Sequence, residues 1–486
     1  MTLSRHFDLL IRNGTVIDGT KAPRFEADVG ITHGRITAIG NLAEATAAQV
    51  VDATDLIVAP GFIDSHTHDD QAVLSHATMP FKVSQGVTTV VAGNCGISAA
   101  PLREGMDLPM PLSLLDSPST GRFTSFAAYL DALRAAPSSV NVAAMVGHST
   151  LRALTMADID RPANDVEIAA MRAHVEEAMQ AGAIGVSTGT FYPAAAKATT
   201  REIIEVCRPL TSRKALYVTH MRDESDQIME ALEETFAIGR ALDVPVVVSH
   251  HKAMHKANFG RTKLTLPVIR EAMQHQCVSL DCYPYTAGST ALRTDRGMLG
   301  GRVLIASSES HPDRAGQDLD DIAIEWGVGK EEAARRLQPG SAIYFIMDED
   351  DVQRVLAFDE TMIGSDGIPL GTKPHPRLWG TFPRVLGHYS RDIGLFPLET
   401  AVWKMTGLTA RNFGLHERGT LKTGHCADLA IFDALRVRDT ASYEKPDAPA
   451  DGIEAVIVNG VLTWQNGKHT GARHGQVITR HGPGRA

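Results

Sequence analysis

Two histidines, His66 and His68, are separated by one residue and follow an apolar run. In a β-strand, residues i and i+2 project from the same face, so both imidazoles can approach one metal ion. Zinc accepts imidazole nitrogen readily. The pair therefore predicts a metal site at the end of a strand. The alternative is a pair of polar residues that only terminate the strand.

Three more candidate ligands follow apolar, β-branched runs: Cys95, His220 and His250. Thiolate and imidazole both suit zinc. A cysteine in this position is otherwise a common buried apolar filler, so its role as a ligand depends on the neighbouring candidates. We expect His251, which follows His250 directly, to point to the opposite face and to be structural.

Asp366 follows the last apolar run of this kind, at residues 361–364. A carboxylate near zinc can bind the metal, take a proton from water and return it to a leaving amine. The alternative is a helix N-cap. We predict that Asp366 is the general base and acid of a hydrolase.

These residues need a scaffold that brings strand ends together. Apolar runs at 87–91, 183–186, 216–219, 244–248, 278–280 and 361–364 alternate with helical patterns. Repeated strand–helix units predict an α/β fold with a parallel sheet, and their number favours a closed (β/α)8 barrel, whose active sites lie at the carboxyl ends of the strands.

Three further segments complete the predicted organisation. Short strand patterns with Asn-Gly turns occupy both ends of the chain, and we expect residues 1–61 and 415–480 to form one small β-sandwich. The metal-dependent barrel is predicted over residues 62–414. Residues 286–345 interrupt the barrel pattern, and a connection this long predicts an inserted lid subdomain.

The composition limits the function classes. Across 486 residues, Lys+Arg number 47 and Asp+Glu 57, so the formal net charge is −10. This balance argues against nucleic acid or an anionic membrane as a partner and leaves a small-molecule substrate. The chain has five cysteines, too few for a disulfide scaffold, and we expect a cytoplasmic protein. The sequence makes no prediction of the oligomeric state.

The motifs resemble the amidohydrolase superfamily, and more closely its N-acyl-D-amino-acid deacylase (D-aminoacylase) family. The resemblance rests on Gly-Phe-Ile-Asp-Ser-His-Thr-His ending at His68, Gly-Asn-Cys-Gly at Cys95, Thr-His-Met-Arg-Asp-Glu at His220, Ser-His-His-Lys at His250 and Gly-Ser-Asp-Gly at Asp366. Many relatives carbamylate a lysine to bridge two metals. Residues 183–186 lack such a lysine, which narrows the resemblance to this family.

The resemblance implies a role for each candidate ligand. Cys95, His220 and His250 would hold one tightly bound zinc ion. His66 and His68 would help to form a second, weaker site, and Asp366 would transfer the proton.

The resemblance also implies that Lys252, Tyr283 and Arg377 grip the carboxylate of the substrate. Lys252 and Tyr283 follow strand ends, and Arg377 lies on the loop after Asp366. A guanidinium group matches a carboxylate in two-point geometry. Without the resemblance, each residue reads as a surface cation or a packed tyrosine.

We therefore predict zinc-dependent hydrolysis of N-acyl-D-amino acids to a carboxylate and a free D-amino acid. The preference for the D form comes from the resemblance alone. Arg293, Arg296 and Arg302 cluster in the insert and could read an acidic side chain, as in N-acyl-D-glutamate, or could form a solvated basic edge. The alternatives are a hydantoinase- or dihydroorotase-like cyclic-amide hydrolase and a non-catalytic zinc-binding protein.

Overall fold

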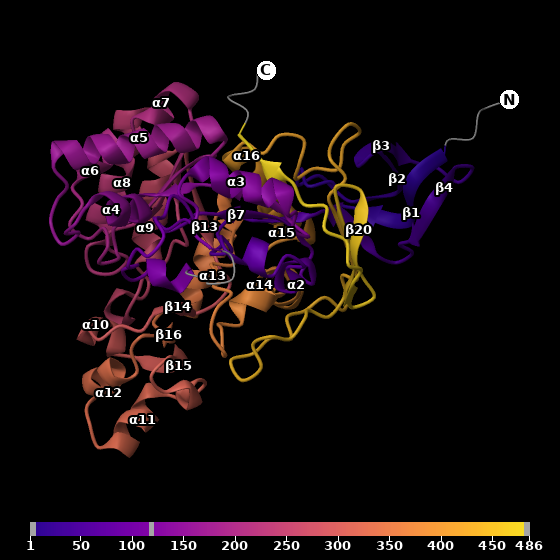
Figure 1. The fold of residues 1–486 in the computed structure, drawn as a ribbon. Helices are drawn as coiled ribbons and strands as arrows, with labels where there is room; N and C mark the ends of the chain where they lie inside the picture. Colours follow the sequence, from indigo (N-terminus) through magenta and orange to yellow (C-terminus); the bar gives the residue numbers. More distant parts are fainter. Residues whose placement is uncertain (1–5, 116–120, 481–486) are drawn as a thin grey trace.

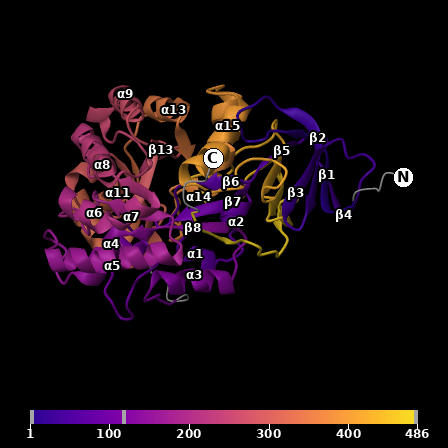
Figure 2. The ribbon, with the colours of Figure 1, turned by 90° about the horizontal axis from the view of Figure 1, so that it is seen from above.

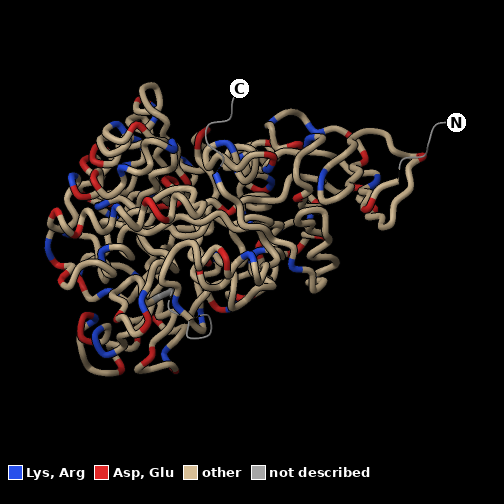
Figure 3. Tube along the Cα trace, turned by 45° about the horizontal axis from the view of Figure 1, so that its top comes forward, with Lys and Arg blue, Asp and Glu red and all other residues tan. Residues whose placement is uncertain are grey.

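The computed structural model describes residues 6–115 and 121–480. Figure 1 shows a body of strands and helices, a sheet on one side that contains strands from both ends of the chain, and a small projection formed by residues 287–345. Within these residues, no helix is both long and apolar enough to cross a membrane. In Figure 3 the basic and acidic residues of the described chain are interspersed.

The body is built on two parallel sheets whose strands are almost entirely buried. One has the order β17-β13-β12-β11-β10-β9 and the other β22-β8-β7-β6. The strands are β6 (Phe62–Asp64), β7 (Val87–Ala92), β8 (Asn141–Ala144), β9 (Val146–Gly147), β10 (Gly185–Gly189), β11 (Leu216–His220), β12 (Val246–Val248), β13 (Val278–Cys282), β17 (Thr361–Ile363) and β22 (Val477–Ile478).

The two sheets are connected at both sides. Only Met145 separates β8 from β9 along the chain. At the other side, the backbone N–H of Ser65, just after β6, donates to the carbonyl of Ile363 in β17 at 3.3 Å. Thr67 and Gly367 form a parallel bridge next to this bond. The segments that carry His66 and Asp366 are thereby neighbours.

Helices cover the outside of these sheets (Figure 2). They include α3 (Phe126–Ala135), α4 (His148–Thr155), α5 (Asp165–Ala181), α6 (Thr200–Cys207), α8 (Ile228–Leu242), α9 (Thr262–Ala272), α13 (Glu349–Ala357), α14 (Arg377–Arg384), α15 (Leu398–Met405) and α16 (Gly407–Phe413). Helix α5 shows why such segments are helical. Asn164 and Glu167 form a capping box at its start, and Gly182 ends it with a left-handed backbone.

Strands from both ends of the chain form one nine-stranded sheet in the order β21-β20-β19-β18-β5-β1-β2-β3, with β4 paired to β1. Its strands are β1 (His6–Val16), β2 (Phe25–Thr32), β3 (Arg35–Gly40), β4 (Thr46–Asp52), β5 (Ile57–Pro60), β18 (Leu429–Phe432), β19 (Ile453–Val458), β20 (Val461–Gln465) and β21 (Lys468–His469). Antiparallel pairing of β18 with β5 joins the two ends. Strand β22 differs from the expectation for residues 415–480, because it pairs with β8 in the body.

The insert has a sheet and an apolar core of its own. Strands β14 (Ala287–Ala291), β16 (Gly340–Phe345) and β15 (Arg302–Ser308) form an antiparallel sheet in that order, beside α10 (Arg296–Leu299), α11 (Leu319–Trp326) and α12 (Lys330–Arg336). Its core also includes Met254 and Tyr283, which follow β12 and β13. The insert is therefore packed against the carboxyl-terminal face of the body.

Candidate active site

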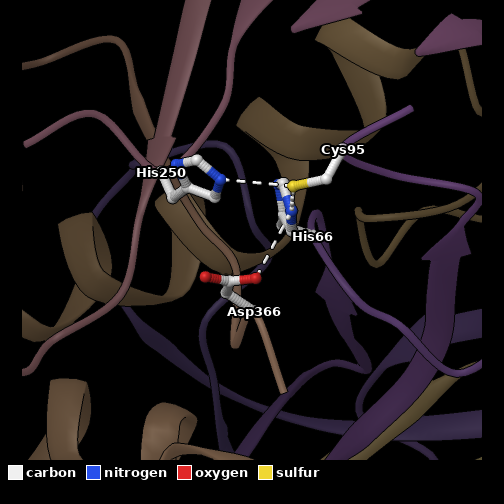
Figure 4. A group of neighbouring side chains, drawn as sticks. All are labelled: His66, Cys95, His250 and Asp366. Atoms are coloured by element: carbon white, nitrogen blue, oxygen red, sulfur yellow. Dashed lines mark hydrogen bonds and ion pairs between the residues drawn. The ribbon is translucent and has the colours of Figure 1, made fainter. Parts of the chain in front are cut away.

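The predicted zinc ligands converge at the carboxyl ends of the parallel strands. The Sγ atom of Cys95 lies 3.3 Å from Nε2 of His66, 3.3 Å from Nε2 of His250 and 3.6 Å from Nδ1 of His220. Figure 4 shows His66, Cys95 and His250 turned toward one another, with Asp366 on the other side of His66.

The spacing of these atoms fits zinc. Bonds of about 2.0–2.1 Å to nitrogen and about 2.3 Å to sulfur place nitrogen and sulfur ligands roughly 3.5 Å apart around a tetrahedral ion. One donor atom from each of His66, Cys95, His250 and Asp366 lies within 4.8 Å of the other three, and all four side chains are buried. The donor set of thiolate, imidazole and carboxylate is one that zinc accepts.

Three of these residues have a left-handed backbone. The φ angles of Cys95, His250 and Asp366 are 54°, 34° and 50°. Non-glycine residues rarely adopt such angles, and where they persist they cluster at functional sites. Each residue lies within three positions of a strand end, so the turn ends the strand and presents the side chain to the site.

Burial keeps two of the histidines neutral. It lowers the pKa of His66 to about 3, and it lowers the pKa of His250 to about 3. A histidine must be neutral to bind a metal through nitrogen. Near neutral pH both imidazoles therefore have a lone pair available.

Asp366 is an ionised carboxylate held by a buried arginine. Burial alone would raise its pKa, but Arg377 and then His250 outweigh burial and hold the pKa well below its usual range. Nη1 of Arg377 lies 2.9 Å from Oδ2 of Asp366, and Arg377 is only 1% exposed. Asp366 therefore begins as a proton acceptor.

His68 contacts the carboxylate of Asp366. Its Nε2 atom lies 3.1 Å from Oδ1 of Asp366, and Nε2 of His66 lies 3.6 Å from the same oxygen. Among the described residues, the groups whose donor atoms could share one ion do not include His68. Its predicted role at a weaker metal site stays a prediction.

Glu224 is a functional candidate that the sequence analysis did not single out. Its Oε1 atom lies 3.1 Å from Nδ1 of His250, and its Oε2 atom lies 3.3 Å from Nε2 of His220. In each ring this is the nitrogen opposite the one that faces Cys95. One carboxylate can therefore orient two zinc ligands. The only sequence signal was its place in the Thr-His-Met-Arg-Asp-Glu motif.

Lys252, one of the predicted substrate anchors, is bound to this carboxylate. Its Nζ atom lies 2.8 Å from both oxygens of Glu224. Burial would raise the pKa of Glu224, but Lys252 and the histidines lower it well below its usual range. The ring of Tyr283 lies close to both other anchors, with Nζ of Lys252 5.7 Å and Cζ of Arg377 4.5 Å from its centroid.

Asp281 is a second carboxylate that sequence reasoning missed. It lies in β13, and its Oδ1 atom accepts the backbone N–H of His250 at 2.8 Å and lies 3.5 Å from Nδ1 of His66. Burial raises its pKa to about 7. A lone acidic residue inside the apolar run at 278–282 was the available signal.

A cavity lies between these residues and the insert. Its lining combines His220, Glu224, His250, Lys252, Tyr283 and Asp366 with apolar side chains, among them Phe191, Tyr192, Met254, Met298, Tyr344 and Ile346. The three arginines predicted to read an acidic side chain do not line this cavity. Arg293, Arg296 and Arg302 pair with Asp295, Glu331 and Asp318 at 2.8, 3.0 and 2.8 Å.

Comparison with family models matches the amidohydrolase family over residues 49–311 and 331–463. The chain is 60% identical over 477 residues to a D-aminoacylase of Alcaligenes xylosoxydans xylosoxydans, covering 98% of each chain. It is 51% identical to an N-acyl-D-aspartate deacylase of the same organism, over 97% of this chain and 95% of the relative.

Solved structures agree with these relatives. A D-aminoacylase structure superposes with a TM-score of 0.96 at 58% identity, covering 98% of this chain and all of that one. That D-aminoacylase is described as having a binuclear metal center, with one-metal activation and second-metal attenuation. An N-acyl-D-glutamate deacylase of Bordetella bronchiseptica, complexed with zinc and a phosphonate inhibitor, superposes with a TM-score of 0.95 at 44% identity. The match covers 98% of this chain and 100% of that one.

A more distant structure shares the fold alone. A dihydropyrimidinase of Brevibacillus agri gives a TM-score of 0.63 at 16% identity, over 98% of this chain and 99% of that one. The resemblance inferred from the motifs is confirmed by the full-length matches. The chain belongs to the amidohydrolase family.

Proposed function

We propose that this protein hydrolyses N-acyl-D-amino acids to a carboxylate and a free D-amino acid, and that it needs zinc to do so. The observation that carries the proposal is the ionised Asp366 carboxylate, which lies 3.6 Å from one of the converging imidazoles at the edge of the cavity. Relatives that match nearly the whole chain are named as deacylases of N-acyl-D-amino acids.

Cys95, His220 and His250 would hold the tightly bound zinc, and His66, His68 and Asp366 would form the weaker site. Glu224 supports this assignment, because it binds the outward nitrogens of both histidines. When bound, zinc polarises the acyl oxygen and lowers the pKa of a water molecule.

Asp366 would move the proton. Its carboxylate takes a proton from the attacking water as the C–O bond forms at the acyl carbon. It then returns that proton to the amide nitrogen as the C–N bond breaks, so that an acid and an amine leave. Arg377 holds the carboxylate in place between the two steps.

Lys252, Tyr283 and Arg377 would bind the carboxylate of the substrate. The support is that Lys252 and Tyr283 line the cavity, while Arg377 lies next to the Tyr283 ring and to Asp366 at its edge. Fixing that carboxylate orients the scissile amide toward Asp366. The insert, which supplies Met298 and Tyr344 to the lining, would act as the lid.

The apolar lining favours apolar D side chains. Phe191, Met254 and Met298 contribute to the cavity, whereas the three arginines of the insert are paired with carboxylates outside it. We therefore expect N-acyl-D-methionine and N-acyl-D-leucine to be better substrates than N-acyl-D-glutamate or N-acyl-D-aspartate.

The same proposal includes a closed barrel. Counting β8 and β9 as one, eight parallel strand positions follow one another from β6 to β17, and the Ser65–Ile363 hydrogen bond joins the last to the first. The barrel would span residues 62–414, with a sandwich from 1–61 and 415–480, apart from β22, which pairs with β8 in the body, and a lid at 286–345. All five cysteines are free thiols, which suits a reducing, cytoplasmic compartment.

The test is amine release by zinc-loaded protein from matched D and L N-acetyl amino acids with methionine, leucine, glutamate and aspartate side chains. Turnover of the D forms alone supports the proposal. Turnover of a hydantoin or dihydrouracil in place of the linear amides would support the cyclic-amide alternative. Tight zinc binding with no hydrolysis of any amide would leave a non-catalytic zinc protein.

A further inference from the structure

A fully buried lysine lies directly behind the Asp366 side of the site. Lys82, in α2 (Pro80–Val83), has 0% exposure. Its Nζ atom lies 2.7 Å from Oδ2 of Asp64, 2.9 Å from Oγ of Ser365 and 3.2 Å from Oδ2 of Asp69. These partners are also completely buried.

Each partner is a close chain neighbour of a site residue. Asp64 precedes His66 by two positions, and Asp69 follows His68 directly. Ser365 immediately precedes Asp366. One ammonium group therefore touches both the chain segment that carries the two histidines and the segment that carries the proton-transfer carboxylate.

Backbone hydrogen bonds continue the same connection. The backbone N–H of Ser365 donates to Oδ1 of Asp64 at 2.7 Å. The N–H of Asp366 donates to the carbonyl of His66 at 2.7 Å, and the N–H of His68 donates to the carbonyl of Gly367 at 3.1 Å. The two segments are thus bonded side by side, with Lys82 at their base.

Stability alone does not account for such a group. Replacing a buried ion pair by well-packed apolar residues is often neutral or even stabilising. What a buried charge with three fixed partners does supply is a defined geometry for those partners. Here the three partners fix the backbone positions of the adjacent site residues His66, His68 and Asp366.

We propose that Lys82 is a positioning residue that holds residues 64–69 and 365–367 in register, so that Asp366 lies against His66 and His68. This inference rests on the proposed function for its catalytic consequence. It assigns to Lys82 the geometry of the weaker metal site and of the proton-transfer step. The Cys95–His220–His250 site, which is oriented by Glu224, does not depend on it.

Another buried lysine provides the matched control. Lys404, in α15, is also 0% exposed, but its Nζ atom donates to the backbone carbonyls of Phe358, Asp359 and Thr361. These bonds lie just before β17 and at its first residue, at the opposite end of that strand from Asp366. Burial lowers the pKa of Lys404 to about 7, so Lys404→Met measures the cost of losing a buried lysine side chain without disturbing the site.

The experiment compares Lys82→Met, Lys404→Met and wild type by zinc titration against a chelator, without substrate, and by steady-state kinetics. In Lys82→Met we expect the tight zinc to remain and the affinity for a second zinc to fall about 10- to 100-fold, the usual effect of losing an outer partner. We expect kcat to fall by a similar factor while KM changes little. Lys404→Met should keep both zinc affinities.

Ser365→Ala provides a second variant if Lys82→Met does not fold. It removes the hydroxyl that accepts from Lys82 and from the N–H of Gly367 and that donates to the carbonyl of His66. We expect a smaller decrease in second-zinc affinity and in kcat than in Lys82→Met. The proposal would be overturned if the affinity for the second zinc were equal in wild type, Lys82→Met and Ser365→Ala. It would also be overturned if the variants lost affinity only for the tight zinc. Because zinc binding is measured without substrate, failure of the proposed hydrolysis is distinguishable from failure of this inference.

Discussion

Arg377 and Asp366 form a buried ion pair in which Nη1 lies 2.9 Å from Oδ2. Burial would by itself favour the neutral acid, and Arg377 outweighs it to keep the pKa of Asp366 well below its usual range. The pair therefore keeps the proton acceptor ionised near neutral pH.

Arg377→Met should move the acidic limb of the pH profile of kcat to higher pH. A carboxylate with a lowered pKa is ionised above that pKa, so removing the cation that lowers it raises the pH below which the acceptor is lost. KM should also rise, because Arg377 is a proposed anchor of the substrate carboxylate. Arg377→Lys keeps the charge and should leave the acidic limb near that of wild type. An unchanged limb in Arg377→Met would contradict this account.

Asp366→Asn should abolish turnover while the tight zinc remains bound. The amide has nearly the same shape as the carboxylate but cannot take a proton, and loss of a general acid–base typically costs about 10²- to 10⁴-fold in rate. Single-turnover kinetics and zinc content measured on the same preparation check this. Activity within a few-fold of wild type would remove Asp366 from the proton-transfer step.

Glu224→Gln should weaken the tight zinc about 10- to 100-fold, because an amide cannot accept hydrogen bonds from both His220 and His250 with its two terminal atoms. It also leaves Lys252 without its carboxylate partner. Chelator competition measures the affinity.

The control for Glu224→Gln is Glu202→Gln. Glu202 is also buried and is bound by Arg152 and His148, at a position that contributes none of the candidate zinc ligands. Its zinc affinity should equal that of wild type even if the variant is less stable. Equal zinc affinity in both variants would show that Glu224 does not orient the ligands.

The sequence predicted the ligand-bearing strands well because hydrophobic runs and the polar residue that follows each run are both local. The strands that precede Cys95, His220, His250 and Asp366 lie within a few residues of their expected places. Strands β8 and β9 were not predicted. The stretch 141–147 contains alanine, asparagine and glycine among its valines, so its β-propensity is weak, and its neighbours in the sheet decide its conformation.

The supporting residues could not be predicted for a different reason. Glu224 and Lys82 act through partners that are distant in sequence: Glu224 contacts Lys252, and Lys82 contacts Ser365, 283 residues away. No spacing rule links such positions. From the sequence, Lys252 was expected to bind the carboxylate of the substrate. In the structure its ammonium group donates to the carboxylate of Glu224. The ion pairs of the insert's arginines could not be predicted either, because folding of the insert brings their partners next to them.

Met298→Ala should change substrate selectivity rather than chemistry. Met298 lies in α10 and contributes an apolar side chain to the cavity lining. Losing part of an apolar pocket typically costs about 1–3 kcal/mol of discrimination, or roughly 10- to 200-fold. We therefore expect kcat/KM for N-acetyl-D-methionine to fall by about this factor, whereas kcat/KM for N-acetyl-D-alanine, whose side chain is a single methyl group, should change little. Ile324→Ala, in α11 of the same insert and 79% exposed, is the control and should change neither value. Equal losses for both substrates in Met298→Ala would mean that Met298 supports the fold of the lid and does not contact the side chain of the substrate.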